Sequence, residues 1–583
     1  MKTSLFINRI VGLFVVLFLA GGSLLAQGGN LVLTASSSFS GNGTIKVKKD
    51  IVNTGVSVDI PIAGTVQMNG GTQSIGGTTP GTGRIDFATL QASAVGAKTF
   101  AVNSHVTAAI DVTGGAGTNF DLGAKTLTLL GTIANTGAGG GAYTFNGAGS
   151  LVNYAETGGT PHIWGTTYDQ LTISATTAID LQGDVTANNT ISQSGAGALA
   201  VNNNLTAGAG YTFGTISNVS SAKTLTLSAA GGSISTLTNN QGTVKNGSGT
   251  LTIATLTDNN GTIENSSNNG PITVTNAATN HGTITGGGGL IDFASDLATS
   301  TGTVTAGSGG ITVGGTTTVN SGQITDATGA VLTFAGNVTN NATPGIALTH
   351  NGHAYFRGAT FSGTGTYSFG GTSMVTYDGT QAQDVLASSY YDFETQKAFT
   401  KTAQGNITVT HSFDNGGFTA NDATTLDMLS HTLTLPATKD NTNATVVFGG
   451  QTNGFAIANT SAGGTVEYNG VSPTVANQHI AAGGYYSLLL VNSAPKNVND
   501  GEEVDVAQNV TVNHDVTLNV GVSLASAIMS VGQQGLGTGN MTINSNAGGT
   551  NPGTVSILGT LNVAGDLTNS GSLSNSGTVT VGW

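Results

Sequence analysis

Short runs of alternating apolar and polar residues follow one another along almost the whole chain. Strict alternation is typical of β-strands with one buried face. Between the runs lie Asn-Gly, Gly-Gly and Ser-Gly pairs, which favour turns, and almost no helical spacing occurs after the first 26 residues. The sequence therefore predicts an all-β protein with strands of about four to six residues. Clear examples are Thr126–Leu129, Thr224–Leu227, Ile272–Val274 and Thr432–Leu435.

A Gly-Thr-Val/Ile phrase recurs at intervals of about 20 residues between positions 240 and 345. Its glycines are Gly242, Gly261, Gly282, Gly302 and Gly322. A second apolar run follows each phrase, at Leu251–Ile253, Ile272–Val274, Ile291–Phe293, Ile311–Val313 and Leu332–Phe334. A unit this short cannot bury its own apolar face, but stacked copies can, because each strand pairs with its equivalent one turn away.

We therefore expect an elongated parallel β-helix, or β-solenoid, with about 20 residues per coil. Val, Ile and Leu should line its interior, and Gly and Asn should occupy corners, where a positive φ costs least. About 557 residues after cleavage of an export signal would make roughly 25 to 28 such coils.

The C-terminal residues carry a tighter repeat of six. Glycines occur at Gly553, Gly559, Gly565, Gly571 and Gly577. Aliphatic residues keep the same spacing at Val555, Leu561, Leu567, Leu573 and Val579. This pattern predicts hexad-type coils with one strand and one corner in each hexad.

A longer unit rich in tyrosine appears in about four copies. The clearest copies combine Gly464–Gly470, Tyr485-Tyr486 and Lys496, and Met374–Gly379, Tyr390-Tyr391 and Lys401. A third runs from Leu151–Tyr154 to Tyr168–Ile173 with Ala178 at the lysine position, and a fourth, Gly64–Gly70 to Lys98, lacks the tyrosines. We interpret the rings as packing where small residues leave gaps. The alternative is an aromatic platform for sugar.

The pattern divides the chain into six segments. They are a signal peptide (1–26), an N-terminal solenoid segment (27–145), a tyrosine-bearing segment (146–232), a regular 20-residue-coil β-helix (233–345), further tyrosine-bearing segments (346–540) and the C-terminal hexads (541–583).

The first 26 residues have the three parts of an export signal. Lys2 and Arg9 supply positive charge, and Ile10–Ala20 supplies an apolar run too short to span a bilayer. We expect cleavage after Ala26, a secreted or cell-surface location, and no transmembrane helix in the mature chain; the alternative is a retained anchor. The chain has no cysteine, so disulfides cannot stabilise it.

Composition excludes several classes of protein. Only 8% of residues are charged and 90 are Gly, yet hydrophobic residues make up 38% and only 9 are Pro, which is unlike a disordered chain. The net charge is −14 with no basic stripe, so no nucleic-acid partner is expected. The one basic run, Lys46–Lys49, is interpreted as a solvated N-terminal edge that discourages strand pairing.

No catalytic, cofactor-binding or metal-binding residue is assigned from the sequence. Asp500, Glu502, Glu503 and Asp505 form the densest acidic cluster and are interpreted as a solvated loop. His350 and His353 flank an Asn-Gly turn without an evident third ligand. Gly114–Asp121 approximates a lone calcium-binding nonapeptide, and Gly286–Gly289 lacks the Lys-Ser/Thr of a phosphate loop. Rows of Thr-x-Thr, which could in principle bind ice or a crystal, are equally explained by β propensity.

The tyrosine-bearing units resemble repeats of large secreted surface proteins from gliding-type bacteria, and the Gly/Asn/Thr coils more loosely resemble autotransporter passengers and haemagglutinin-type adhesins. The resemblance implies a surface-displayed β-solenoid for adhesion or extracellular structure. We therefore expect a non-enzymatic structural or adhesive bacterial protein. Extracellular polysaccharide or protein, or end-to-end self-association, would supply its partners. The alternatives are a carbohydrate-active β-helix enzyme (a polysaccharide lyase or hydrolase) and a glycan- or surface-binding module.

Overall fold

The structure is a computed structural model. It describes residues 23–26, 30–34, 39–54, 59–77, 83–137, 140–159, 161–227, 230–265, 270–326, 329–348, 351–415, 424–429, 431, 433–434, 438–440, 445–448, 465–469, 478–480, 483–485, 487–513, 515–521, 527–531, 540–545 and 551–582. Most of the expected signal peptide lies outside these residues. Strand β1 (Ser23–Ala26) is described, and it pairs in parallel with β3 (Thr44–Val47). Cleavage after Ala26 would remove β1 from this sheet.

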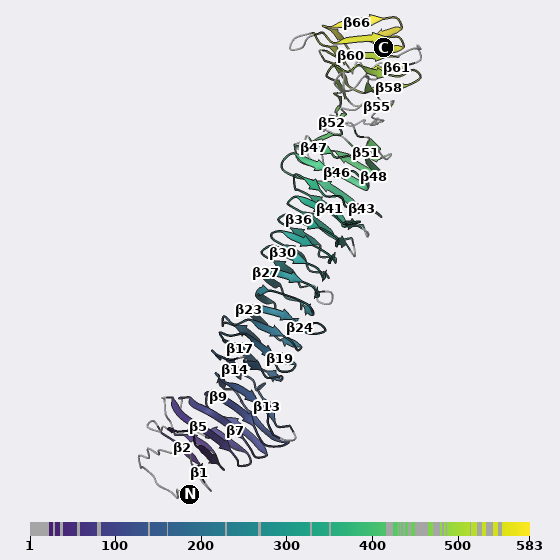
Figure 1. Ribbon diagram of the computed structural model, residues 1–583. Coiled ribbons are helices and arrows are strands. Elements are labelled where there is room, and N and C mark those ends of the chain that lie inside the picture. The colour runs from purple at the N-terminus through teal and green to yellow at the C-terminus, as the bar shows by residue number, and fades with distance from the viewer. Residues whose placement is uncertain are drawn as a thin grey trace. The chain divides into compact units, whose positions relative to one another are not determined.

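The chain is all-β, with parallel strands stacked as a β-solenoid of about 22 turns and roughly 21 residues per turn (Figure 1). The predicted fold class is confirmed, but the prediction of 25 to 28 coils was too high because several turns carry loops. Gln73 and Lys98, for example, are in register one turn apart although 25 residues separate them (98 − 73). The chain divides into two compact units, residues 1–291 and 292–583.

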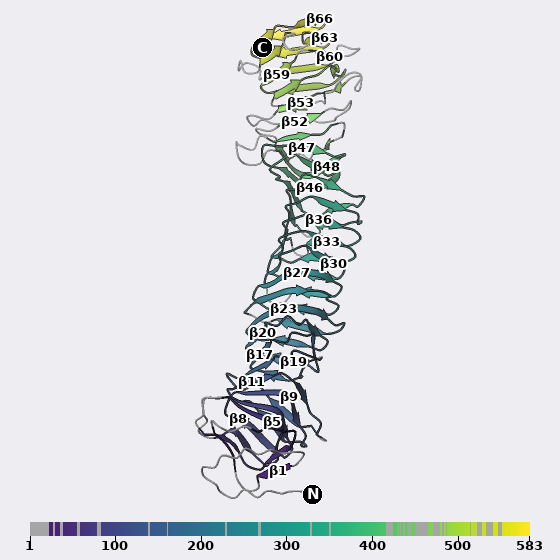
Figure 2. The ribbon, with the colours of Figure 1, turned by 60° about the vertical axis from the view of Figure 1, so that its left-hand side comes forward.

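In the first unit, the predicted 20-residue repeat forms turns with strands on three faces. One turn consists of β27 (Leu251–Asn259) and β28 (Thr262–Glu264). The next consists of β29 (Ile272–Val274), β30 (Ala278–Asn280) and β31 (Thr283–Thr285). Equivalent strands pair in parallel, Leu251 with Ile272 and Thr262 with Thr283. Strands β27 and β30, which also pair, follow one another along the stack in Figure 2. The aliphatic residue of each phrase points inward and is buried, as at Ile263 and Ile284.

The glycine that opens each phrase is required by close approach of the backbone. A Cβ on Gly261 would lie 2.1 Å from the carbonyl oxygen of Gly242, and one on Gly282 would lie 2.1 Å from that of Gly261. None of these three glycines has a positive φ. The expectation that positive φ selects glycine here was therefore wrong. Successive corners stack so closely that a side chain does not fit.

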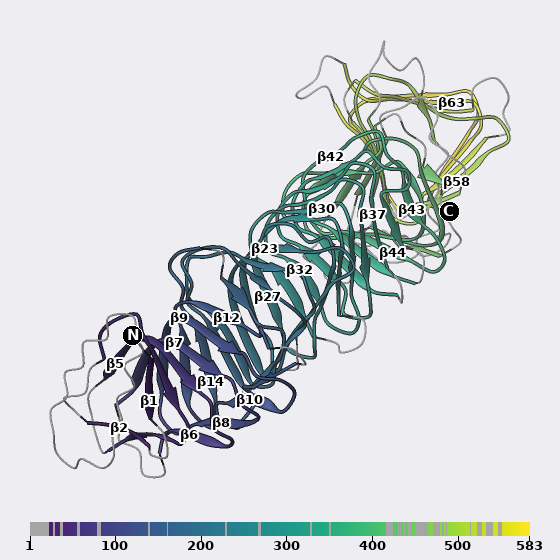
Figure 3. The ribbon, with the colours of Figure 1, turned by 60° about the horizontal axis from the view of Figure 1, so that its bottom comes forward.

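The second unit repeats this construction and ends in three-sided turns. Strands β34 (Thr303–Ala306) and β37 (Gln323–Asp326), which follow Gly302 and Gly322, pair in register. Towards the C-terminus the hexads form β63 (Thr554–Ile557), β64 (Thr560–Val563), β65 (Leu567–Asn569), β66 (Ser572–Asn575) and β67 (Thr578–Val581). Each hexad contributes one strand, as predicted, and three consecutive strands belong to three different sheets (Figure 3).

Aromatic rings fill the interior of the second unit between residues 334 and 413. Phe334 stacks on Phe356 with a centroid distance of 5.3 Å, and Phe356 stacks on Tyr377 at 5.5 Å. The series continues through Phe393 to Phe413, whose rings are 5.7 Å apart and nearly parallel. This ladder fixes the register of the strands whose outer faces carry the polar network described next.

Candidate functional site

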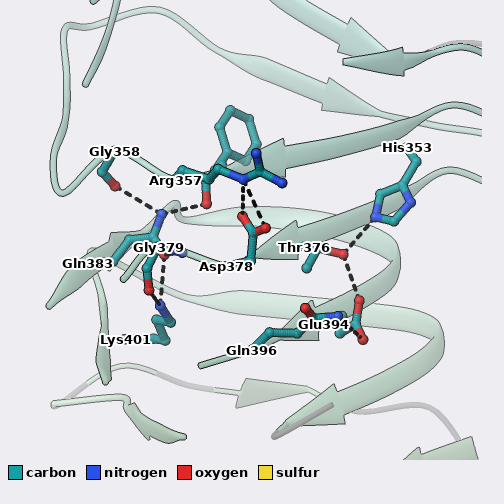
Figure 4. A network of polar contacts seen from close by, with 11 residues as sticks. His353, Arg357, Gly358, Thr376, Asp378, Gly379, Gln383, Glu394, Gln396 and Lys401 are labelled. Carbon is teal, nitrogen blue, oxygen red and sulfur yellow. Dashed lines mark hydrogen bonds and ion pairs between the residues drawn. The ribbon is translucent and has the colours of Figure 1, made fainter. Parts of the chain in front are cut away.

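A network of polar side chains crosses three successive turns of the second unit (Figure 4). Strands β41 (His353–Phe356), β44 (Met374–Tyr377) and β46 (Ser388–Thr395) carry its outer part, and β48 (Ile407–Asn415) pairs with β46 on the following turn. Side chains alternate between the two faces of a strand, so the inward-facing Val375 and Tyr377 place Thr376 on the outer face. Register then aligns Tyr355, Thr376, Glu394 and Asp414 in one row across the turns.

The centre of the network is a hydrogen-bonded relay of His353, Thr376 and Glu394. The Thr376 hydroxyl donates to Glu394 Oε2 at 2.8 Å, so it accepts from His353 Nε2, which lies 2.7 Å away. Gln396 Nε2 donates to Glu394 Oε1 at 2.7 Å. Burial lowers the pKa of His353, and the charges of Glu394 and Asp378 oppose that effect. Each member of the relay therefore stands on a different turn and is held by its neighbours.

A histidine, a hydroxyl and a carboxylate are also the parts of a nucleophilic catalytic group. Here the hydroxyl lies between the other two, and both its donor and its acceptor capacity are used within the relay. Thr376 is 0% exposed and Glu394 is 2% exposed. The buried oxygens of the relay therefore connect three turns of the solenoid through hydrogen bonds.

An ion pair between Arg357 and Asp378 lies beside the relay. Arg357 Nε donates to both carboxylate oxygens of Asp378, at 3.0 and 3.2 Å. The guanidinium carbon lies 5.6 Å from the centre of the Tyr355 ring, a cation–π distance. Asp378 is 8% exposed, and the guanidinium group of Arg357 balances the charge of this buried carboxylate.

Beneath the ion pair a lysine and a glutamine meet inside the solenoid. Gln383 lies on β45 (Gln383–Val385) and Lys401 on β47 (Thr400–Ala403), in register one turn apart. Lys401 Nζ donates to Gly379 O at 2.9 Å and to Gln383 Oε1 at 3.1 Å. Gln383 Nε2 donates to the carbonyl oxygens of Phe356 and Gly358 at 2.7 and 2.9 Å. Burial lowers the pKa of Lys401 to about 8, against an opposing effect of Asp378.

The same pairing of glutamine and lysine occurs near the N-terminus. Gln73 on β6 (Gln73–Gly76) is in register with Lys98 on β8 (Gly96–Phe100). Lys98 Nζ lies 2.6 to 3.0 Å from four backbone carbonyl oxygens, and burial lowers its pKa to about 8. These carbonyl groups are those of Gly70, Gly71, Ala94 and Gly96. An ammonium group offers three N–H donors to these acceptors, so the hydrogen bonds partly oppose the effect of burial.

A third pair lies nearer the C-terminus. Gln478 on β54 (Gln478–His479) is in backbone register with Lys496 on β57 (Lys496–Val498). Lys496 Nζ donates to Ala494 O at 2.7 Å, and burial lowers its pKa to about 7. The lysines that the sequence grouped by spacing thus share one structural position, a buried place on a strand in register with a glutamine of the preceding turn.

The tyrosines form pairs whose hydroxyl groups meet inside the solenoid. The O···O distances are 2.8 Å for Tyr154 and Tyr168, 2.9 Å for Tyr377 and Tyr390, and 3.0 Å for Tyr468 and Tyr485. All six rings are buried. Packing therefore describes these six, whereas Tyr391 lies on the outer face and stacks on His411 with centroids 4.5 Å apart.

The first two tyrosine pairs each form hydrogen bonds with both backbone groups of one loop residue. Trp164 donates its N–H to Tyr154 Oη and accepts at its carbonyl from Tyr168 Oη. Leu386 is held in the same way by Tyr377 and Tyr390. Gln383 lies three residues before Leu386, and Pro161 lies three residues before Trp164, so Pro161 is the equivalent of Gln383. His162 pairs with Asp180 on the next turn, which places Pro161 opposite Ile179. The lysine position in this copy is therefore Ile179 and not the predicted Ala178.

The other sequence candidates lie apart from one another. Asp500 lies in a turn and Glu502 Oε2 accepts from Asn499 N at 3.0 Å, whereas Glu503 and Asp505 are exposed on β58 (Glu503–Val506). Asp121 Oδ1 accepts from Gly123 N at 3.0 Å and so closes a turn. Gly286–Gly289 is a loop before β32 (Ile291–Phe293).

The sequence also singled out the basic run Lys46–Lys49 and the pair His350 and His353. Strand β3, which carries Lys46, pairs on both sides, with β1 and with β5 (Ile60–Met68), so it is not an edge while β1 is present. His350 lies outside the described residues, and His353 belongs to the relay.

An asparagine ladder inside the first unit was not foreseen. Asn240 Nδ2 donates to Asn259 Oδ1, and Asn259 Nδ2 donates to Asn280 Oδ1, both at 2.7 Å. All three side chains are buried. The signal was available in the sequence, because each asparagine lies two residues before the glycine of its phrase.

Comparisons with known proteins found no match: no protein family, no curated protein and no solved structure matches the chain. The class of this protein is therefore defined by its fold. Within the described ranges, no helix has the length and apolar character needed to cross a bilayer. Among the same residues, no three His, Cys, Asp or Glu side chains gather as metal ligands would. The chain is thus a parallel β-solenoid with turn-to-turn polar networks.

Proposed function

We propose that this chain is an exported structural or adhesive protein of the bacterial cell surface or extracellular space, and that it is not an enzyme. The observation that carries the proposal is the closure of the network around Thr376. Its hydroxyl and the carboxylates of Glu394 and Asp378 are buried and bonded to side chains of neighbouring turns. These contacts run along the stacking direction, where they add to the backbone pairing that resists separation of turns.

A polysaccharide lyase or hydrolase on this fold is the rival. Such an enzyme needs carboxylates, or a carboxylate with a base, that reach the sugar from adjacent turns. Glu394 and Asp378 do come from adjacent turns, but each is already satisfied by protein groups, Gln396 and Arg357 among them. An extracellular polysaccharide or protein is therefore proposed as a surface to which the chain attaches, and self-association as a second mode of assembly.

The experiment measures attachment and turnover together. The purified full chain is incubated with a panel of insoluble and soluble polysaccharides and with bacterial cells. We expect the labelled chain to sediment with at least one surface and to release no reducing ends or unsaturated sugars. Degradation that Glu394→Gln abolishes would overturn the proposal in favour of the enzyme.

Export is tested separately by N-terminal sequencing of the protein recovered from culture medium or cell surface. A mature chain that begins at Gln27 is the expected result. Retention of the whole chain in the cytoplasm would contradict the proposed location.

A further inference from the structure

The buried contact between Lys401 and Gln383 has a chemical consequence that the proposed function does not use. The amine Nζ lies 3.1 Å from the carboxamide oxygen Oε1. Lys401 is 0% exposed and Gln383 is 2% exposed, so water does not compete for either group. An amine and a carboxamide held together in an apolar interior are the two reactants of an amide exchange.

We propose that Lys401 and Gln383 join in an intramolecular isopeptide bond that links two successive turns of the solenoid. Nζ forms a bond to Cδ of Gln383, the bond from Cδ to Nε2 breaks, and the nitrogen of the former carboxamide leaves. Written from the ammonium form, –NH3⁺ and –CONH2 become –NH–CO– and NH4⁺. Atoms and charge balance, and no oxidant or reductant is needed.

Hydrogen bonds around Gln383 hold its carboxamide in a suitable orientation. Gly379 N–H donates to Oε1 at 3.2 Å, and this oxygen carries the negative charge in the tetrahedral intermediate. On the other side, Nε2 is held by the carbonyl oxygens of Phe356 and Gly358, which can also accept from the departing ammonia. Burial lowers the pKa of Lys401 to about 8, so part of the population has the nucleophilic free amine near neutral pH.

The bond would also remove an energetic cost. A buried ammonium group without a carboxylate at hydrogen-bond distance is unfavourable, and the secondary amide that replaces it has no charge. The solenoid does not need a polar pair at these strand positions, because Pro161 and Ile179 occupy the equivalent positions in the first unit. A chain without cysteine has no disulfide to link its turns, whereas an isopeptide bond would do so.

The proposal is confined to this pair. Gln73 is held as Gln383 is, with Nε2 donating to Val47 O and Lys49 O, but Lys98 directs its Nζ to four backbone carbonyl oxygens and not to the carboxamide. At Lys496, the contact described is with Ala494 O. Lys98 therefore serves as an internal comparison for Lys401.

Peptide mapping of the purified full chain by mass spectrometry tests the bond. Trypsin cuts after Arg357, Lys397 and Lys439, so Gln383 lies in peptide 358–397 and Lys401 in peptide 398–439 when cleavage after Lys401 is blocked. We expect these two peptides to be joined, with a combined mass about 17 Da below their sum because ammonia is lost. Fragmentation should place the link at Gln383 and Lys401.

Matched variants locate the chemistry. Lys401→Met and Gln383→Leu should each give unlinked peptides, whereas Lys245→Met, at an exposed lysine, should leave the link intact. Free Gln383 and normal cleavage after Lys401 in the folded wild-type chain would overturn the proposal, and this decisive measurement needs no variant to fold. That result would leave the proposed function standing, since attachment and turnover are measured separately.

Discussion

Tyr377 and Tyr390 meet through their hydroxyl groups, 2.9 Å apart, in the interior of the second unit. Together they satisfy both backbone groups of Leu386: its N–H donates to Tyr377 Oη at 3.2 Å, and its carbonyl accepts from Tyr390 Oη at 2.7 Å. The side chains thus do for a loop residue what a neighbouring strand does elsewhere in a solenoid. A loop can enter and leave the coil at this point without unpaired polar groups.

Tyr390→Phe should therefore destabilise the loop that contains Leu386. The change leaves the Leu386 carbonyl without its donor and the hydroxyl hydrogen of Tyr377 without its acceptor, at a cost of about 1–3 kcal/mol for buried groups. Hydrogen exchange of residues 383–390 should become faster. Tyr391→Phe is the control, because this ring lies on the outer face against His411, and it should leave the exchange unchanged. Equal effects of both changes would contradict the role of the hydroxyl pair.

Gly261→Ala should destabilise the first unit through steric conflict. Its Cβ would lie 2.1 Å from Gly242 O, so the corner must open, and overpacking of this kind typically costs about 1–3 kcal/mol. The midpoint of urea unfolding measures the effect. Gly158→Ala is the matched control, since a Cβ there meets nothing within 4 Å, and its midpoint should stay at the wild-type value. A wild-type midpoint for Gly261→Ala would show that the corners are less closely stacked than described.

The fold was predictable because it follows from local periodicity. The phrase around Gly261 repeats at nearly constant spacing, and alternation alone places Ile263 inside. Constant spacing also implies parallel register between equivalent strands, which the pairing of Thr262 with Thr283 confirms.

The relay was not predictable in the same way. His353, Thr376 and Glu394 are separated by 23 and 18 residues, and their contact depends on the length of each intervening loop. Spacing in the sequence identified Lys401 as a repeated residue, but only the register of β45 and β47 shows that it lies inside against Gln383. Side-chain contacts between turns of unequal length can be identified only after the structure has aligned those turns.

Asn259→Ala should weaken the first unit at the asparagine ladder. Asn259 accepts from Asn240 and donates to Asn280 Oδ1 and to Thr283 O, so its removal takes a hydrogen bond from each of three groups on two other turns. We expect a loss of about 1–3 kcal/mol in the free energy of unfolding. Asn260→Ala, one residue away, removes an exposed side chain and should change the unfolding midpoint little. A larger effect at Asn260 than at Asn259 would contradict the ladder's contribution.

Lys98 should make the stability of the first unit depend on pH. Burial lowers its pKa in the folded chain to about 8, below the ordinary lysine value of 10.5. Between these two values the unfolded chain binds a proton that the folded chain has released. The free energy of unfolding therefore rises as the pH increases from 8 to 10, and this gain is lost when the pH is lowered again to 8. Below pH 8 both states hold the proton and the dependence ends.

Urea unfolding of wild type and Lys98→Met at pH 7, 8, 9 and 10 measures this dependence, because groups that titrate equally in both proteins cancel in the difference. We expect wild type to gain stability relative to Lys98→Met from pH 8 upward. Lys245→Met, at an exposed lysine, should track wild type throughout. The four carbonyl oxygens around Lys98 Nζ stabilise the ammonium form, so they reduce the slope without reversing it. A difference that stays constant from pH 7 to 10 would mean that these carbonyl groups fully offset burial and that the buried lysine remains charged.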